Sequence, residues 1–229
     1  MHGVWTRVLR LNDRRQSRGA RRFGARLAAK TRLPFLTEAD ARTLASAARE
    51  SSCDCRLARF EPMEVRRLRE QEVEEIRALR LRAIADSPFA FSSSHRRELD
   101  RPEDFWYQLA RASEQALSQV TFVAVEDERW IGMAGVFVSQ DDPRCGQVWG
   151  MWVAPSAREA GVGRRLMDSI RTWATTRGLE RLRLSVSNSE RSGPARRLYE
   201  AIGFRATGEQ EAMASDPALR ADVMSLALA

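Results

Sequence analysis

The amino-acid sequence predicts a mixed α/β domain that begins near Met63. From residue 63 to residue 228, segments alternate in the order strand, two helices, three strands, helix, strand, helix, two strands. A buried apolar strand at 148–153 is followed by a glycine-containing loop that leads directly into a helix. The 229 residues are enough for one medium-sized domain with an appendage, or for two small domains.

The first half of this domain is predicted from alternation, helical spacing and turn residues. Met63 opens an alternating, strand-like run, and the amphipathic pattern after it stops at Asp86-Ser87-Pro88. Arg101-Pro102 is typical of a helix start, and two later apolar runs are separated by a charged turn, as in a hairpin. The expected elements are a strand at 63–68, helices at about 70–85 and 101–118, and strands at 121–125 and 130–138.

The second half shows the same signals. Gly178 follows a helical pattern as a stop, and the strict alternation that buries Leu182, Leu184 and Val186 on one face predicts a strand. The expected elements are a strand at 148–153, a helix at about 162–177, a strand at 181–187, a helix at about 194–202, and strands at about 204–208 and 222–228.

The first 62 residues form a basic, arginine-rich extension. They contain 14 basic and 6 acidic residues, a net charge of +8, whereas the rest of the chain carries −1. The basic pI therefore belongs to this segment and says nothing about the substrate. We expect residues 1–62 to be largely disordered, with a short helix at 38–49 that Thr37 could cap.

The composition argues against several classes of protein. No apolar run approaches the length of a membrane span, and no apolar segment follows the basic start as a secretory signal requires. We therefore expect a cytoplasmic protein without a membrane partner. Cys53, Cys55 and Cys145, with two histidines in the chain, make neither a disulfide framework nor a zinc site, and we expect no metal.

The loop after the 148–153 strand has the composition of an anion-binding site. The first turn of a helix leaves backbone N–H groups unpaired and carries a partial positive charge, so a phosphate can bind there. Gly161 and Gly163 allow close approach to the backbone, and Arg158, Arg164 and Arg165 add positive charge. The loop lacks the marks of a dinucleotide fingerprint or a P-loop. Taken alone, the pattern also fits ordinary turn chemistry.

Three segments occur in a characteristic order. They are L-R-L-R-A-I-A-D-S-P-F-A-F at 79–91, R-E-A-G-V-G at 158–163, and L-Y-E-A-I-G-F at 198–204. The first looks like the first helix and following loop of the GNAT superfamily of N-acetyltransferases. The second resembles that family's Arg/Gln-x-x-Gly-x-Gly/Ala loop, and the third its Leu-Tyr-Glu-x-x-Gly-Phe segment. The resemblance covers roughly residues 63–229 and favours the phosphate-binding interpretation of the loop.

The resemblance implies a mostly antiparallel sheet that splays between two parallel strands, with helices on both faces. In the family, acetyl-CoA lies between these strands, which here are 148–153 and 181–187. A backbone N–H near Val153 would also polarise the thioester carbonyl. The pantetheine arm would contact Met151, Trp152 and Val153, and the pyrophosphate would contact Arg158, Glu159, Ala160, Gly161, Val162, Gly163 and Arg164.

The resemblance also assigns a catalytic residue, with two departures from the family's pattern. Tyr199 falls on the tyrosine that protonates the departing CoA thiolate; packing in the core is the alternative. The family's asparagine, seven residues earlier, is Ser192 here. The nearest asparagine, Asn188, is a candidate cofactor contact, and the choice between the two stays open. Residues 147–153 contain no carboxylate to act as general base, and the turn acids at 141–142 are expected to be solvated.

The implied function is transfer of an acetyl group from acetyl-CoA to a primary amine of a small molecule or peptide by direct attack. The acceptor is expected near 89–94 and 208–217, and its identity does not follow. The absent base keeps a second hypothesis, a catalytically silent acyl-CoA-binding module. In a third, the basic extension delivers the enzyme to nucleic acid, a partner that we do not expect. Dimers are frequent in similar proteins, so a homodimer is compatible with the resemblance.

Overall fold

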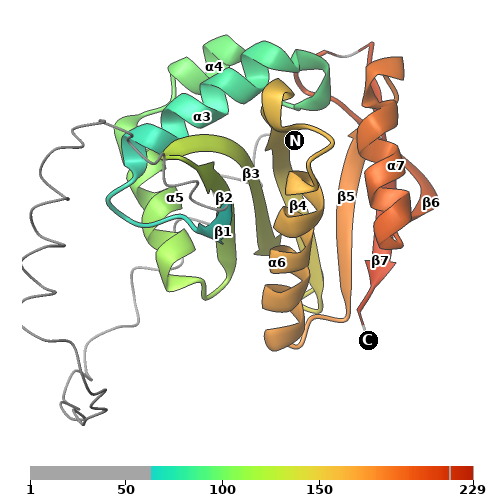
Figure 1. Cartoon of the computed structure of the whole chain (residues 1–229). Helices are drawn as coiled ribbons and strands as arrows, with labels where there is room; N and C mark the ends of the chain where they lie inside the picture. The colour runs from blue at the N-terminus through green and yellow to red at the C-terminus, as the bar shows by residue number, and fades with distance from the viewer. Residues whose placement is uncertain (1–62, 217, 229) are drawn as a thin grey trace, which may run out of the picture. The chain divides into compact units, whose positions relative to one another are not determined.

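A seven-stranded sheet forms the centre of the computed structural model, which describes residues 63–216 and 218–228 (Figure 1). The strand order is β1-β2-β3-β4-β5-β7-β6, and neighbours run antiparallel except β4 and β5, which are parallel. The expected disorder of residues 1–62 and the helix at 38–49 lie outside the described residues. The strands are β1 (Glu64–Arg67), β2 (Gln119–Glu126), β3 (Arg129–Val138), β4 (Cys145–Val153), β5 (Arg181–Ser187), β6 (Arg205–Ala212) and β7 (Arg220–Ala227).

Helices cover both faces of the sheet, as the resemblance implies. A Cβ atom added to Gly132 of β3 would lie against side chains of α6. The next residue, Met133, has its side chain beside Gly150, and Arg80 of α3 lies beside the same glycine. Because successive strand residues point to opposite faces, α3 and α6 lie on opposite sides. No helix among the described residues is long and apolar enough to cross a membrane. The helices are α3 (Val73–Asp86), α4 (His95–Leu99), α5 (Glu103–Gln115), α6 (Val162–Thr176) and α7 (Gly193–Ile202), with 3-10 turns η2 (Pro88–Ala90), η3 (Pro155–Ala157) and η4 (Glu190–Ser192).

The core follows from the apolar spacing of the elements. Four residues that recur at helical spacing in α6 are all buried: Val162, Leu166, Ile170 and Trp173. The alternating residues Leu182, Leu184 and Val186 of β5 are buried as well. Burial of a large aliphatic side chain contributes about 1.5–3 kcal/mol. These two elements therefore pack firmly, and they position the loops at their ends.

Several predicted boundaries differ from the structure. The helix expected from Arg101 to Ser118 ends at Gln115, because Ala116 adopts a left-handed conformation with φ of 49°. The strand expected at 148–153 starts at Cys145, and the one expected at 204–208 continues to Ala212. The short helix α4 was not predicted. Its signal is Ser94, whose hydroxyl accepts a hydrogen bond from the Arg97 N–H at 3.3 Å.

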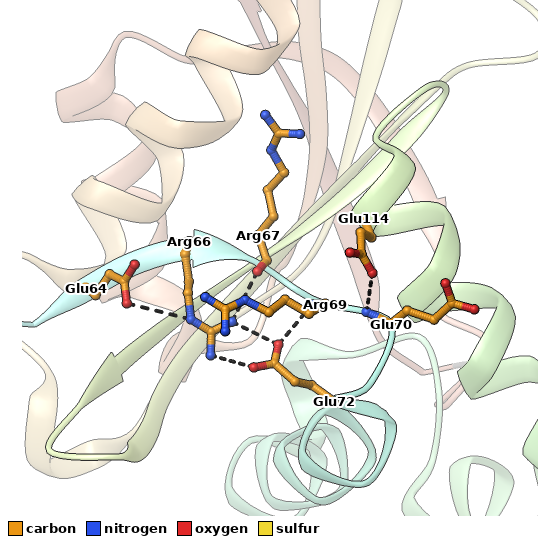
Figure 2. A network of polar contacts seen from close by, with 7 residues as sticks. All are labelled: Glu64, Arg66, Arg67, Arg69, Glu70, Glu72 and Glu114. Carbon is orange, nitrogen blue, oxygen red and sulfur yellow. Dashed lines mark hydrogen bonds and ion pairs between the residues drawn. The ribbon is translucent and has the colours of Figure 1, made fainter. Parts of the chain in front are cut away.

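A network of charged residues joins β1 to α3 (Figure 2). The Arg66 guanidinium donates two hydrogen bonds to the Glu72 carboxylate, at 2.7 and 2.8 Å. The same carboxylate accepts the Arg69 N–H at 2.9 Å, and the Arg66 guanidinium lies 5.7 Å from the Trp130 ring centre. Glu114 of α5 accepts the Glu70 N–H at 2.7 Å. The network fixes the connection from β1 to α3.

Candidate active site

The sheet opens between its two parallel strands. β4 and β5 pair only over Cys145–Gln147, opposite Arg181–Arg183. Beyond these residues β4 continues to Val153 and β5 to Ser187, without further pairing between them. Toward the carboxyl end of β4, the backbone edge that faces β5 is therefore not paired with β5. This is the splayed arrangement that the resemblance implies.

A β-bulge in β4 accounts for the separation. Between the paired positions Trp149 and Trp152, β4 has one residue more than β3, so Gly150 and Met151 together face Ala134. Gly150 has φ of +68°, a left-handed conformation that glycine adopts without steric cost. A bulge bends its strand and increases the local twist. The C-terminal half of β4 therefore turns away from β5.

The open edge of β4 presents the backbone N–H of Val153. The Ala154 N–H donates to the Ile131 carbonyl of β3 at 2.8 Å. Because alternate strand residues direct their backbone groups to opposite edges, the Val153 N–H points away from β3. The Val153 carbonyl accepts a hydrogen bond from Arg158 Nε at 3.1 Å. Val153 thus offers a donor on this edge, while its acceptor already has a partner.

Asp86, at the end of α3, holds the residues that follow β4. Its carboxylate accepts the Trp152 Nε1–H at 2.9 Å and the Ser87 hydroxyl at 2.7 Å, and it forms an ion pair with Arg158. Burial alone would raise the pKa of Asp86, but these hydrogen bonds together hold it below its ordinary value. The Trp152 indole is therefore turned toward α3, and Arg158 is anchored beside the loop.

The N-terminus of α6 has the features of an anion site. Gly161 is the N-cap residue, and no side chain caps the helix. The Arg165 N–H donates to the Gly161 carbonyl at 3.1 Å, so the N–H groups of residues 162–164 have no carbonyl partner within α6, which is described throughout. The first turn has no acidic residue, and Arg164 is exposed on it. A pyrophosphate fits this donor set.

The residues of the loop have different structural roles. A Cβ on Gly161 would meet nothing within 4 Å, so its backbone is open to a ligand. A Cβ on Gly163 would lie 2.8 Å from Leu198 Cδ2, so Gly163 also serves the close packing of α6 on α7. Glu159 has φ of 67°, which is uncommon for a residue with a side chain, and it leads into Ala160. This strained turn brings the chain from η3 into α6.

Tyr199 of α7 is buried and 6% exposed. Its ring meets Phe204 edge to face, with the centroids 5.8 Å apart. Burial raises the pKa of Tyr199, so the phenol keeps its proton at neutral pH. Ser192 lies seven residues earlier, at the N-cap of α7. Its buried hydroxyl has no hydrogen-bond partner among the described residues.

The remaining candidates are bonded to other residues or exposed. Asn188 is exposed at the end of β5, where its side-chain oxygen accepts the Arg220 N–H at 3.3 Å. Asp142 forms an ion pair with Arg181 at the paired end of β4 and β5, away from the opening. Asp141 is exposed in the same turn. Within residues 63–216 and 218–228, no three His, Cys, Asp or Glu side chains gather as a metal site.

One charged cluster near the opening was not predicted from the sequence. Arg80 of α3 lies over the Phe91 ring, 4.5 Å from its centroid, and 5.7 Å from that of Trp149. Its Nε is 4.0 Å from the buried carboxylate of Glu98, which also binds Arg101 at 2.9 Å. The sequence feature that could have indicated this cluster is spacing. Arg80 follows Ile76 by four residues and so falls on the apolar side of the helix.

The family model that describes the acetyltransferase (GNAT) family matches residues 79–204. No curated protein sequence matches the chain. Solved structures share the fold at low identity. A GNAT-family acetyltransferase from Streptococcus pneumoniae is 17% identical, with a TM-score of 0.63, and the match covers 73% of this chain and 100% of that one.

Two further structures contain the coenzyme. The PaiA N-acetyltransferase from Thermoplasma acidophilum, in complex with coenzyme A, is 13% identical with a TM-score of 0.59 and covers 72% of this chain and 99% of its own. YncA from Salmonella typhimurium, with its cofactor acetyl-CoA, is 17% identical with a TM-score of 0.60. The match covers 73% of this chain and 95% of YncA. The family model spans more than half of the chain, so this protein belongs to the GNAT family of acetyltransferases.

Proposed function

We propose that this protein transfers an acetyl group from acetyl-CoA to a primary amine. The observation that carries the proposal is the pair of parallel strands that part after Gln147, together with the N–H groups at the start of α6 that no carbonyl of that helix accepts. The first offers a backbone edge to the pantetheine arm, and the second offers donors to the pyrophosphate. The coenzyme complexes of PaiA and YncA support the same choice of acetyl donor.

The loop residues 158–164 supply the pyrophosphate contacts in this proposal. The backbone N–H groups of residues 162–164 donate, and the open backbone at Gly161 lets the phosphates approach. Arg164 adds positive charge from its exposed position. Along β4, Met151 and Val153 contact the pantetheine arm, and Trp152 contributes only backbone because its indole is held by Asp86.

The reaction needs no covalent enzyme intermediate. The amine nitrogen attacks the thioester carbonyl carbon, a C–N bond forms, and the C–S bond breaks. The Val153 N–H stabilises the oxyanion that develops, and the Tyr199 phenol gives its proton to the departing thiolate. The proton that the amine loses passes to water, and the phenolate regains one from solvent. The raised pKa of Tyr199 keeps the donor protonated beforehand.

Ser192 fits the family's asparagine position better than Asn188 does. The Ser192 hydroxyl is buried and has no hydrogen-bond partner among the described residues. The side-chain oxygen of Asn188 is already bonded to the Arg220 N–H. We therefore assign the polar contact to the coenzyme to Ser192, with Asn188 as a neighbouring residue at the end of β5.

A thermal melt with CoA and acetyl-CoA, combined with a thiol-release assay over a library of amines, tests the proposal. A ligand at about 100 times its Kd adds about 2.7 kcal/mol of stability. No stabilisation by either ligand would contradict the assignment of the donor. Stabilisation by acetyl-CoA without thiol release from any amine would instead favour the silent acyl-CoA-binding module, which the lack of a carboxylate in residues 147–153 suggests. A cytoplasmic location and a homodimer stay predictions from the sequence.

A further inference from the structure

Arg80 is a nearly buried cation with an unused hydrogen-bond donor. Its side chain is 12% exposed, and its Nη1 atom is buried without a hydrogen-bond partner among the described residues. Buried polar groups are normally paired, because an unpaired donor loses its bonds to water. Burial lowers the pKa of Arg80 to about 10, so the guanidinium is still charged at neutral pH. An orphaned donor of this kind calls for a ligand.

Among the described residues, the charges in contact with Arg80 do not balance. Glu98, 1% exposed, accepts two hydrogen bonds from Arg101, at 2.9 and 3.2 Å. Arg80 Nε is 4.0 Å from the same carboxylate, beyond hydrogen-bond distance. Burial alone would raise the pKa of Glu98, but the Arg101 hydrogen bond and the charge of Arg80 hold it below its ordinary value. The cluster thus contains two cations and one anion, and a second anion would complete it.

The position of Arg80 relates it to the opening of the sheet. Its Nη1 lies 3.4 Å from the point that a Cβ on Gly150 would occupy, beside the bulge that turns β4 away from β5. The rings of Phe91 and Trp149 lie against the guanidinium and hold it in place. Phe91 is itself tied to the connection between β6 and β7, because its carbonyl accepts the Ser215 hydroxyl at 2.5 Å.

Arg80 is separate from the proposed pyrophosphate site. That site is at the start of α6, on the face of the sheet that Gly132 contacts. Arg80 projects from α3, which lies on the other face. The two cationic sites therefore flank β4 from opposite faces of the sheet, and an anion bound at Arg80 would be separate from the pyrophosphate.

We propose that Arg80 binds the carboxylate of the acceptor, so that the protein acetylates the amino group of a small amino acid-like substrate. The inference rests on the proposed function. A planar guanidinium pairs with a carboxylate through parallel N–H···O bonds, and the aromatic walls of Phe91 and Trp149 restrict its orientation. The carboxylate would fix the acceptor relative to the bulge at Gly150, so that its amine reaches the acetyl group.

The test compares L-α-amino acids with their own carboxamides in the thiol-release assay, using the full chain. The carboxamides have the lower amine pKa, so without an anion site they react faster at neutral pH. We expect the opposite order, with kcat/KM about 10- to 100-fold higher for the best amino acid than for its carboxamide, the range for a hydrogen bond to a charged group. R80Q removes this preference by lowering only the amino-acid rate, and R80K retains part of it.

Arg77, one turn earlier on α3, provides the matched control, and R77Q keeps the preference of the unchanged protein. Equal or faster reaction of the carboxamides, or an unchanged preference in R80Q, would overturn the inference while leaving the acetyltransferase activity in place. If no amine causes thiol release, the proposed function fails instead. In that case, calorimetry measures binding of the amino acid and of its carboxamide to CoA-saturated protein. Binding of the amino acid but not of its carboxamide supports the anion site at Arg80, and binding of neither overturns it.

Discussion

Tyr199 carries the most specific chemical role that we assign to one side chain. Its phenol is buried, packed against Phe204 and held protonated by burial. We expect Tyr199→Phe to lower turnover by about 10²–10⁴-fold, the usual effect of losing a general acid. The measurement is the rate of thiol release at saturating acetyl-CoA. The melting temperature and its rise with acetyl-CoA should stay the same, because the ring is kept.

The only other tyrosine makes a matched control. Tyr107 of α5 is 49% exposed, and Tyr107→Phe should leave the rate unchanged. A Tyr199→Phe rate within about twofold of the unchanged protein would remove Tyr199 from the mechanism and leave it as a packing residue.

At the scale of elements, the glycine in the bulge of β4 links the shape of the sheet to ligand binding. Gly150→Ala puts a side chain on a left-handed backbone, which costs about 1–2 kcal/mol. Its Cβ would also lie 3.4 Å from both Arg80 Nη1 and Met133 Cε. We expect a lower melting temperature and, because the bulge shapes the open edge of β4, a smaller stabilisation by acetyl-CoA at a fixed concentration.

Gly178 separates these two effects. It follows the C-terminus of α6 with φ of +70°, and a Cβ added to it would meet nothing within 4 Å. Gly178→Ala should lower the melting temperature by a similar amount and leave the stabilisation by acetyl-CoA intact. If the two variants lose ligand stabilisation equally, the bulge has no special part in binding.

The extent to which the sequence predicts the structure also differs between elements. Strands and helices with strict periods, such as 181–187 and α6, are readable because their buried side follows from spacing alone. The exposed strand β6 has no apolar alternation, so its continuation to Ala212 depends on pairing with β7. The short helix α4 depends on one cap at Ser94. Periodicity carries no information on such elements.

The candidate site divides in the same way. The glycine loop and Tyr199 lie in contiguous sequence motifs, so the proposed acetyl-CoA site can be predicted from the sequence. Arg80, Glu98 and Trp149 come from α3, α4 and β4 and meet only after folding. Their pairing depends on distances such as the 4.0 Å between Arg80 and Glu98, which no local pattern contains. The proposed acceptor site is therefore apparent only from the folded structure.

At the scale of the whole molecule, paired carboxylates make stability depend on pH. Burial alone would raise the pKa of Glu72, but hydrogen bonds from Arg66 and the Arg69 N–H hold it below its ordinary value. A lowered pKa means that this stabilisation is complete above the pKa of the unfolded chain, about 4.3, and is lost as pH falls through the folded value. We expect the melting temperature to fall between about pH 5 and pH 3.

Two variants test whether the β1–α3 network contributes to this loss. Glu72→Gln should cost about 1 kcal/mol at pH 7, because a charged hydrogen-bond partner is removed, and should flatten the fall below pH 5. Glu64, 63% exposed and 3.7 Å from Arg66, is the control, and Glu64→Gln should keep the steep profile. An unchanged acid profile in Glu72→Gln would assign the loss to other carboxylates, such as Asp86 or Asp222.

The charge of the chain is unevenly distributed between its first 62 residues and the rest. Residues 1–62 carry a net charge of +8, while every proposed site residue lies between Arg80 and Tyr199 in the part that carries −1. We expect a protein that begins at Met63, the first described residue, to keep its melting transition and its stabilisation by acetyl-CoA. Binding to a polyanion such as heparin, measured at low and high salt, should be lost with the extension, because that binding depends on the number of cationic contacts. Undiminished polyanion binding by the shortened protein would place a basic surface on the catalytic domain itself, and loss of the acetyl-CoA effect would show that the extension takes part in binding the donor.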